Sequence, residues 1–187
     1  TQMITKGLDF KNVTLAAVLA ADGGLYMDSY KSYERTFSQI TQVLGRAGRG
    51  DVRGLGIIQT YSPENYVIKA ASAHNYDEFY QTEIILRKQM KFPPFCDIIS
   101  LTGSSEVKGE ALKTVTKAYD MLMFYKNTKG FSDDELKFFK PTEAPLFKIK
   151  NKYRYKFTVK AAKSINIFPV VSKILKEIKS GITADVL

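Results

Sequence analysis

The feature that most restricts the fold is a continuous apolar run, NVTLAAVLAAD, at residues 12–22. Runs of this kind, without polar alternation, are typical of strands buried inside a parallel sheet. Apolar residues then recur at helical spacing over Tyr33–Leu44, and a glycine-rich segment ends that helix. A second apolar stretch, Leu55–Tyr61, is stopped by Pro63. Strand, helix and strand in this order predict an α/β layer with right-handed crossovers.

Two adjacent prolines, Pro93 and Pro94, mark the clearest boundary, because they cannot continue the amphipathic helix expected over roughly Tyr76–Met90. Beyond them the pattern predicts a β-α-β-β-α-β order, which is that of a ferredoxin-like α+β domain. The expected elements are a strand at 96–106, a helix at 108–126, two strands around a basic loop at 137–162, a helix at 165–179 broken near its start by Pro169, and a strand at 182–187.

Composition limits the class of protein. Apolar residues make up 44% of the 187 residues, which is enough for a core and excludes a disordered chain. Cys96 is the only cysteine, so an internal disulfide or a clustered zinc site is excluded and a reducing, cytoplasmic setting is expected. No stretch is long and apolar enough to span a membrane, so no membrane partner is expected. The start lacks an initiator methionine and a signal peptide, and an excised fragment is expected.

The net charge of +9 is concentrated in one segment. Residues 137–163 hold nine basic residues and one acidic residue, Glu143. Such a concentration is typical of a surface that binds a polyanion such as DNA. A solvated lysine-rich surface without a partner is the alternative that charge alone leaves open.

Arg46 and Arg49, in the stretch QVLGRAGRG, form the sharpest local pattern. Residues three apart on the last turn of a helix lie on one face, so both guanidinium groups can reach one anion. The corresponding chemistry is charge stabilisation as a γ-phosphate leaves. The alternative is a glycine-rich helix end with two surface arginines.

The first ten residues, TQMITKGLDF, form a second pattern. Thr1, Thr5 and Lys6 offer hydroxyl and ammonium donors beside Gly7, a combination that can bind a DNA phosphate. Asp9 either orders this loop or contacts a nucleotide ribose. An ordinary polar loop is the alternative.

Taken together, TQMITKGLDF and QVLGRAGRG resemble motifs V and VI of superfamily 2 helicases. The longer sequence that joins the two motifs includes VTLAAVLAADGGL and SYERTFSQITQVLGRAGRG. It resembles the primosomal protein N′ family of replication-restart DNA helicases. The later APLFKIKNKYRYKFTVKA resembles the C-terminal domain of that family, and only the final ADVL is a loose match.

The resemblance implies a fold and a division of the chain. Residues 1–68 would be the second half of a RecA-like C-terminal helicase lobe, 69–92 a connecting helix and linker, and 93–187 a basic domain that binds DNA or partners. Arg49 would be the arginine finger, with Arg46 and Gln42 beside it. The implied ATP-binding positions also include Gly7, Asp9 and Gly45, and the implied DNA contacts include Thr1 and Lys6.

The resemblance also implies activities that this chain cannot perform alone. The family is an ATP-dependent 3′-5′ helicase that uses ATP and Mg²⁺, but no GxxxxGK[ST] loop and no DExH-type motif are present here. The family's zinc-binding cysteines are also missing, so zinc is expected only in a region absent from this chain. We therefore predict no ATP hydrolysis by the chain alone, no metal site and no bound cofactor. Asp22 matches an acidic family position whose role is undefined.

The basic C-terminal segment alternates cations with rings. Lys150, Lys152, Arg154 and Lys156 are the predicted DNA contacts. The rings that lie between them either stack on unpaired bases or form the buried face of a strand, and strand periodicity favours the buried face. The exposed residues would then be Arg154, Lys156 and Thr158.

Three functions remain in competition. The first is a helicase fragment whose partners are forked or single-stranded DNA, single-strand-binding protein and other primosome proteins. The second is a nucleic-acid-binding module without energy coupling, and the third is a module that docks primosome proteins. The full-length protein is expected to be a monomer, whereas the half lobe, which lacks neighbouring strands, exposes a sheet edge through which the fragment can dimerise.

Overall fold

The computed structural model describes residues 13–27, 29–48, 54–178 and 180–187. The chain divides into two compact units, residues 1–86 and 87–187. Each unit has its own apolar core.

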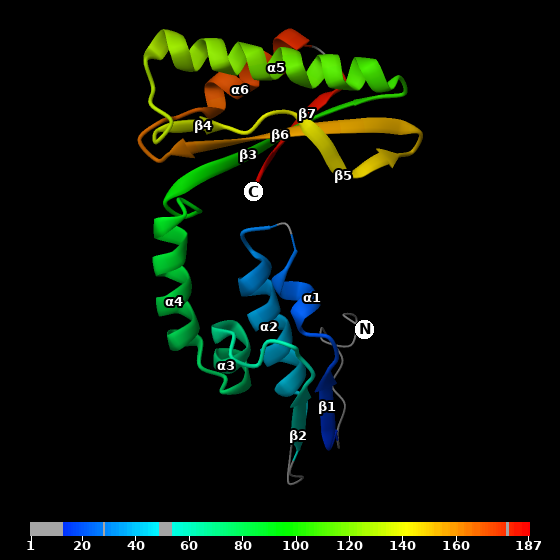
Figure 1. The fold of residues 1–187 in the computed structure, drawn as a ribbon, viewed down its shortest axis with the longest axis vertical. Helices are drawn as coiled ribbons and strands as arrows, with labels where there is room; N and C mark the ends of the chain where they lie inside the picture. Colours follow the sequence, from blue (N-terminus) through cyan, green and yellow to red (C-terminus); the bar gives the residue numbers. More distant parts are fainter. Residues whose placement is uncertain (1–12, 28, 49–53, 179) are drawn as a thin grey trace. The chain divides into compact units, whose positions relative to one another are not determined.

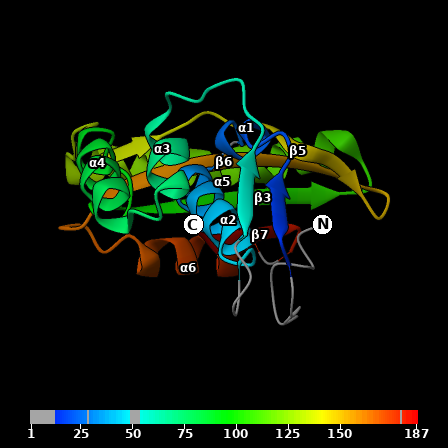
Figure 2. The ribbon, with the colours of Figure 1, turned by 90° about the horizontal axis from the view of Figure 1, so that it is seen from below.

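Unit 1 is built on two parallel strands. β1 (Leu15–Val18) pairs with β2 (Leu55–Ile58) in the same direction, as Figures 1 and 2 show. Between them come the short α1 (Asp22–Leu25) and the longer α2 (Ser32–Leu44), and α3 (Tyr66–Ser72) and α4 (Tyr76–Gln89) follow. The predicted order of strand, helix and strand is therefore confirmed over the described residues.

One face of this small sheet packs against helices. Phe37 and Ile40 of α2, Val67 of α3 and Phe79 of α4 form the core, and the ring of Phe37 stacks on that of Phe79 at 4.4 Å between centroids. Asn65 begins α3 by accepting a hydrogen bond from the Val67 N–H, as N-cap residues do.

The opposite face of the same sheet is exposed, and the prediction of a strand buried on both faces is wrong here. Leu15 of β1 and Leu55 of β2 are partners in the register and lie side by side on this face. They are 55% and 59% exposed, and Ile57 on the same face is 45% exposed. The apolar run indicates a strand that could be buried on both faces. The described residues, however, pack against only one face of this sheet.

Unit 2 is a five-stranded antiparallel sheet with two helices. Its elements in chain order are β3 (Cys96–Ser105), α5 (Lys108–Lys129), β4 (Leu136–Phe138), β5 (Thr142–Ile149), β6 (Lys152–Ala162), α6 (Phe168–Ile178) and β7 (Ile182–Val186). The strands run in the order β4-β6-β3-β7, and β5 also pairs with β6. Three strands, rather than the predicted two, therefore lie between the helices.

Both helices pack on the same face of this sheet (Figure 1). The core between them contains Ala111, Val115, Ala118 and Leu122 of α5 together with sheet residues such as Phe157. The buried stripe of α5 starts at Ala111, whereas the adjacent Leu112 is 41% exposed.

The ends of the unit 2 helices follow local chemistry. α5 ends at Gly130, whose φ of 72° lies in the left-handed region that glycine adopts without a steric cost. Pro169 is the second residue of α6, where a missing N–H costs nothing because the first turn has no acceptor for it. α6 therefore begins at Phe168 instead of being broken by the proline.

Candidate nucleic-acid interface

The basic segment folds into a hairpin. β5 and β6 pair antiparallel and are joined by Lys150 and Asn151, which have φ values of 47° and 62°. Two left-handed residues in a two-residue loop are typical of the hairpin turns that match the twist of the strands. Asparagine suits this conformation, whereas lysine adopts it at a steric cost, so Lys150 is held at the turn by the hairpin around it.

Side chains alternate along β6, as predicted. Tyr155, Phe157 and Val159 are 7%, 1% and 0% exposed and belong to the core under the helices. Arg154 and Lys156 point to the opposite face and are half-buried. The rings are thus core residues, and the cations lie on the face of the sheet that α5 and α6 do not cover.

The neighbouring strand places hydroxyl side chains on this face, of which Thr102 is buried and Ser104 is half-buried. In the register of β3 and β6, Ser104 lies opposite Arg154 and Thr102 lies opposite Lys156. These side chains are short and carry hydroxyl groups. We name the row of Lys152, Arg154 and Lys156 the β6 cation row.

The single acid of the basic segment lies on the other side of the sheet. Glu143 pairs in register with Tyr155, a core-facing residue. Its carboxylate is 3.4 Å from the Lys108 ammonium and accepts a hydrogen bond of 3.4 Å from the Tyr155 hydroxyl. The pKa of Lys108 is raised by its proximity to Tyr155 and by the ion pair with Glu143. The β6 cation row therefore has no carboxylate from its own hairpin on its face.

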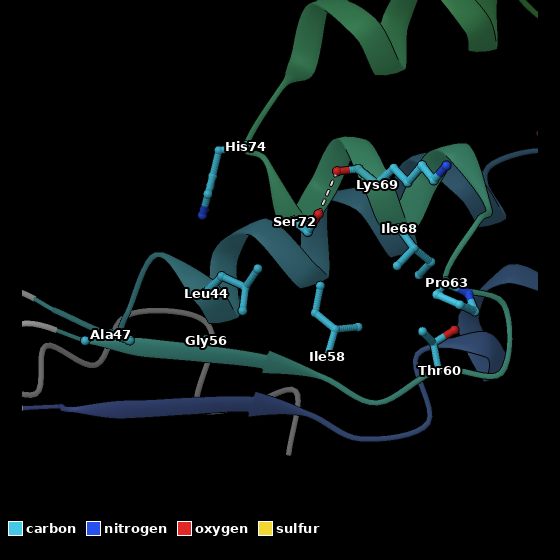
Figure 3. Close-up of a pocket in the computed structure, with 11 residues that line it drawn as sticks. Leu44, Ala47, Gly56, Ile58, Thr60, Pro63, Ile68, Lys69, Ser72 and His74 are labelled. Atoms are coloured by element: carbon cyan, nitrogen blue, oxygen red, sulfur yellow. Dashed lines mark hydrogen bonds between the residues drawn. The ribbon is translucent and has the colours of Figure 1, made fainter.

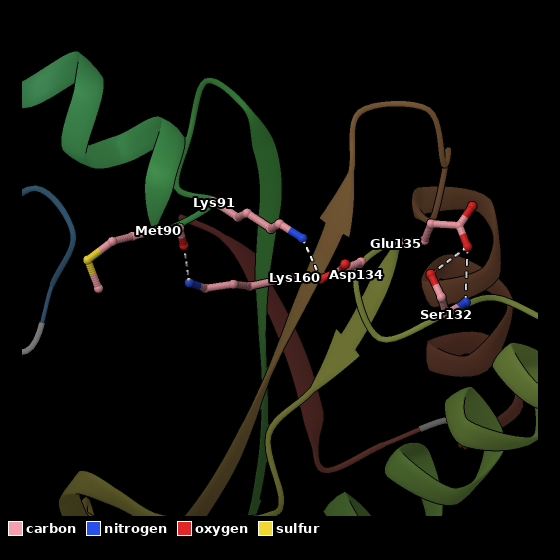
Figure 4. A network of polar contacts seen from close by, with 6 residues as sticks. All are labelled: Met90, Lys91, Ser132, Asp134, Glu135 and Lys160. Carbon is pink, nitrogen blue, oxygen red and sulfur yellow. Dashed lines mark hydrogen bonds and ion pairs between the residues drawn. The ribbon is translucent and has the colours of Figure 1, made fainter.

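Lys160, farther along β6, has a structural role instead. Its ammonium donates a hydrogen bond of 3.3 Å to the Met90 carbonyl (Figure 4). The same ammonium lies 3.9 Å from the centre of the Phe92 ring. Burial lowers the pKa of Lys160, and the neighbouring Lys137 adds to the lowering. Lys160 thus fastens the segment that follows α4 to the sheet of unit 2.

A second set of polar contacts lies close to this one in Figure 4. The Lys91 ammonium pairs with Asp134 at 2.5 Å, and this contact lowers the pKa of the Asp134 carboxyl. The Glu135 carboxylate accepts hydrogen bonds from the Ser132 N–H and hydroxyl at 3.0 and 2.8 Å, which lower the pKa of Glu135. These acids stabilise the turn before β4.

The predicted nucleotide-binding residues are only partly described. Gln42 lies in the last turns of α2 and is exposed, and Arg46 follows the helix and is half-buried. Gly45 and Arg46 donate backbone hydrogen bonds to the carbonyls of Thr41 and Val43, so the predicted helix end is confirmed. The remaining predicted site residues, Thr1, Lys6, Gly7, Asp9 and Arg49, lie outside the described residues.

Asp22 joins the two loops that follow the parallel strands. Its carboxylate accepts a hydrogen bond of 2.8 Å from the Thr60 hydroxyl and one of 2.9 Å from the Tyr61 N–H. The Tyr61 N–H, followed by the hydroxyls of Thr60 and Ser62, lowers the pKa of Asp22. The arrangement fixes loop geometry at the carboxyl edge of the sheet, which the sequence did not reveal because Thr60 and Tyr61 are far away along the chain.

An open pocket lies between β2 and the helices α2 and α3 (Figure 3). Its described walls combine apolar residues such as Leu44 and Ile58 with polar ones, among which Lys69 and His74 are ionisable. The described residues that line it include no carboxylate or cysteine.

Within the described residues no group of three or more His, Cys, Asp or Glu side chains could hold a metal ion. None of the helices in the described part of the chain has the length and hydropathy needed to cross a membrane.

Comparison with known proteins gives consistent matches. A family model described as the primosomal protein N C-terminal domain matches residues 88–184. The Replication restart protein PriA of Bacillus subtilis (strain 168) is 39% identical over 182 residues, which cover 97% of this chain and 22% of that protein. The proteins of the same name from Synechocystis sp. and Borreliella burgdorferi are 36% and 33% identical over 186 and 180 residues, covering 100% and 96% of this chain and 22% and 26% of theirs. The chain thus spans about a quarter or less of the length of these relatives.

Proposed function

The chain belongs to the primosomal protein N C-terminal domain family, and on that basis we propose that it is the C-terminal part of a replication restart protein that recognises stalled or forked DNA. In this proposal unit 1 is half of a RecA-like helicase lobe and unit 2 is a ferredoxin-like domain. The parallel pairing of β1 and β2 supports the first assignment. The antiparallel order β7-β3-β6, with β4 and β5 at the far side of β6, supports the second.

The proposal rests on how charged side chains are distributed between the two faces of the unit 2 sheet. Lysine and arginine of the β6 cation row lie on one face, while Glu143 and the rings of β6 lie on the other. A hairpin that places its cations on one face and its acid on the other attracts a polyanion to the cationic face. DNA is the polyanion that the names of the relatives suggest.

The same family membership supports a motor role in the full-length protein. We propose an ATP-dependent 3′-5′ helicase in which ATP and Mg²⁺ are held mainly by residues outside this chain. Arg49 would act as arginine finger, and Arg46, Gln42 and Gly45 would lie beside the phosphates. Single-strand-binding protein and other primosome proteins would be partners.

The motor role is tested by nucleotide turnover. The purified 187-residue chain should not hydrolyse ATP, because it lacks the phosphate loop and the magnesium-binding motif. Arg49→Ala in the full-length protein should lower turnover by about 10³-fold or more, as removal of an arginine finger does. Turnover by the chain alone, above that of its own Arg49→Ala variant, would contradict the proposal.

The DNA role is tested by fluorescence anisotropy with a labelled forked DNA across a salt series. Charge reversal of Lys150, Lys152 and Arg154 should abolish binding that the unchanged chain shows at low salt. Undiminished binding by the reversed variant would place the contact elsewhere.

A docking module without energy coupling is the second candidate. It is favoured by apolar side chains on α5, of which Leu112 is 41% and Phe124 is 73% exposed. Partner binding through these residues should survive high salt, whereas phosphate contacts weaken steeply as salt rises.

A further inference from the structure

We propose that the outer edge of β7 binds an extended segment of a partner protein, which adds to the sheet of unit 2 as a further antiparallel strand. The segment has apolar residues at alternate positions and one lysine or arginine opposite Asp185. Such binding does not depend on the proposed contact with DNA.

β7 forms one edge of the unit 2 sheet. It lies at the end of the strand order β4-β6-β3-β7, and within the described residues it pairs with β3 alone. The Leu187 N–H donates a hydrogen bond of 3.0 Å to the Ile98 carbonyl, and the Gly181 carbonyl accepts one of 2.7 Å from the Ser104 N–H. In an antiparallel pair, positions that exchange hydrogen bonds alternate with positions that do not. These two contacts therefore determine which backbone groups of β7 point toward β3.

The backbone groups of every second residue point away from β3. These residues are Ile182, Ala184 and Val186, whose partners in the register occupy the non-bonded positions. Within the part of the chain that the structure describes, their N–H and C=O groups have no hydrogen-bond partner on the outer side. An added antiparallel strand can bond to all three residues, which is the main-chain recognition used in β-strand addition.

The opposite edge of the sheet is protected against such addition, whereas β7 is not. β4 at that edge is only three residues long. β5 contains Pro145, follows Pro141 and has a register shift between Glu143 and Lys148. Short strands, prolines and bulges are features by which proteins block strand addition at an edge. β7, with the sequence ITADV, contains no proline or lysine and pairs with β3 without a register shift.

The two faces of β7 determine which side chains fit beside it. Ile182 and Ala184 pack against the core that α5 and α6 cover, and Val186 is 62% exposed on the same side. Thr183 and Asp185 project from the opposite face. Asp185 is exposed and has no ion pair within the described residues. A strand that alternates apolar residues with polar ones therefore complements both faces.

A cation opposite Asp185 is favoured by position as well as by charge. In the added pair this residue lies at a non-bonded position, where facing side chains approach most closely. Opposite charges directly across two strands should raise the affinity about two- to fivefold.

A second copy of the chain fits this edge less well. Two β7 strands paired about Ala184 would place Thr183 opposite Asp185 and leave both carboxylates without a cation. Each chain also carries a net charge of +9, which opposes association of two copies. The occupant is therefore a segment of a different protein.

An NMR titration of the isotope-labelled 187-residue chain with a peptide whose core is Val-Lys-Val-Thr-Val tests the pairing. In the free chain, the amides of Ile182, Ala184 and Val186 should exchange rapidly with solvent, whereas those of Thr183 and Asp185 should be protected. At a peptide concentration about nine times Kd, exchange of the outward amides should slow about tenfold. The same peptide with N-methyl groups on its valines lacks the N–H groups that face β7 and should not bind.

A matched pair of variants locates the peptide. Ala184→Pro removes one outward N–H without breaking a bond to β3, a position at which edge strands accept proline, and should weaken binding about tenfold or more. Ala184→Ser keeps this N–H and should bind as the unchanged chain does. Replacing the peptide lysine by threonine should weaken binding about two- to fivefold, and in Asp185→Asn this difference should disappear.

Four outcomes would overturn the inference. Protected amides at Ile182, Ala184 and Val186 in the free chain would mean that the edge is already occupied. Absence of peptide binding, or equal binding of the N-methylated peptide, would exclude strand addition. Association of the chain with itself that Ala184→Pro abolishes would identify a second copy as the occupant. An unchanged preference for lysine in Asp185→Asn would contradict the stated chemistry of the partner. None of these results affects the DNA titration, which uses other variants.

Discussion

Replacing Gly103 by alanine tests the contact between α5 and the sheet of unit 2. Gly103 lies in β3, and a Cβ atom placed there would be 2.8 Å from the Ala111 carbonyl oxygen and 3.0 Å from the Val115 Cβ. Both residues are completely buried, and ordinary contacts begin near 3.4 Å. The helix would therefore have to move away from the strand by about half an ångström, because a backbone carbonyl cannot rotate aside as a side chain does.

The cost follows from two opposing effects. Overpacking a core costs about 1–3 kcal/mol, and the lost freedom of the unfolded chain returns about 0.4–1 kcal/mol. The net loss of unfolding free energy is about 1–2 kcal/mol. For a unit of about 100 residues this corresponds to a decrease in melting temperature of about 5–15 °C.

Differential scanning calorimetry of the whole chain measures this loss, because it can resolve the melting of unit 2. Gly109→Ala is the matched control, since no atom lies within 4 Å of its added methyl group and it falls in the first turn of α5. The control should stabilise unit 2 by about 0.5–1 kcal/mol. If Gly103→Ala and Gly109→Ala shifted the melting temperature equally, the close approach of α5 to β3 would be refuted.

Three further predictions concern other parts of the chain. Thr36→Val should raise the unfolding free energy by about 1 kcal/mol in urea titrations, because the Thr36 hydroxyl is buried without a hydrogen-bond partner among the described residues. The pKa values of Asp22 and Asp134 are lowered below 3.8 in the folded chain, so the stability they contribute is complete above about pH 5 and is lost as pH falls through their folded values. Urea midpoints at pH 6 and pH 3 should therefore differ less in Asp134→Asn than in the unchanged chain. Leu55→Lys should reduce self-association in sedimentation experiments, because Leu55 is 59% exposed on an apolar sheet face.

The faces of β6 could be predicted from the sequence because their cause is local. Strand geometry alone places alternate residues on opposite sides, and the sequence alternates cations with rings from Lys152 to Phe157. The buried Tyr155 and Phe157 and the outward Arg154 confirm this prediction. The helix α4 was predictable for the same reason, since its amphipathic pattern lies within one continuous segment.

The errors arose where burial or pairing depends on distant residues. β4 is only three residues long, and it exists because Leu136 and Phe138 pair with Ala161 and Val159 of β6. No periodicity can appear over three residues, so this strand was missed. The exposed face of β1 was missed because an apolar run predicts suitability for burial, whereas burial itself requires neighbours that the described residues do not supply.

The number of cations that can bind DNA also depends on distant residues, and this number determines the salt dependence expected in a binding measurement. Nine cations against one acid in residues 137–163 suggest a large phosphate-binding surface. In the fold, however, Lys160 is bonded to the Met90 carbonyl, Lys163 is paired with Asp97, and Lys148 lies 4.6 Å from the centre of the Tyr153 ring on the helix side. If all the excess charge contacted phosphates, the salt slope for duplex DNA would be near −7, whereas the three cations of the β6 cation row can give a slope no steeper than about −2.7. A slope near the smaller value would mean that the fold, rather than the composition, determines how many lysines bind DNA.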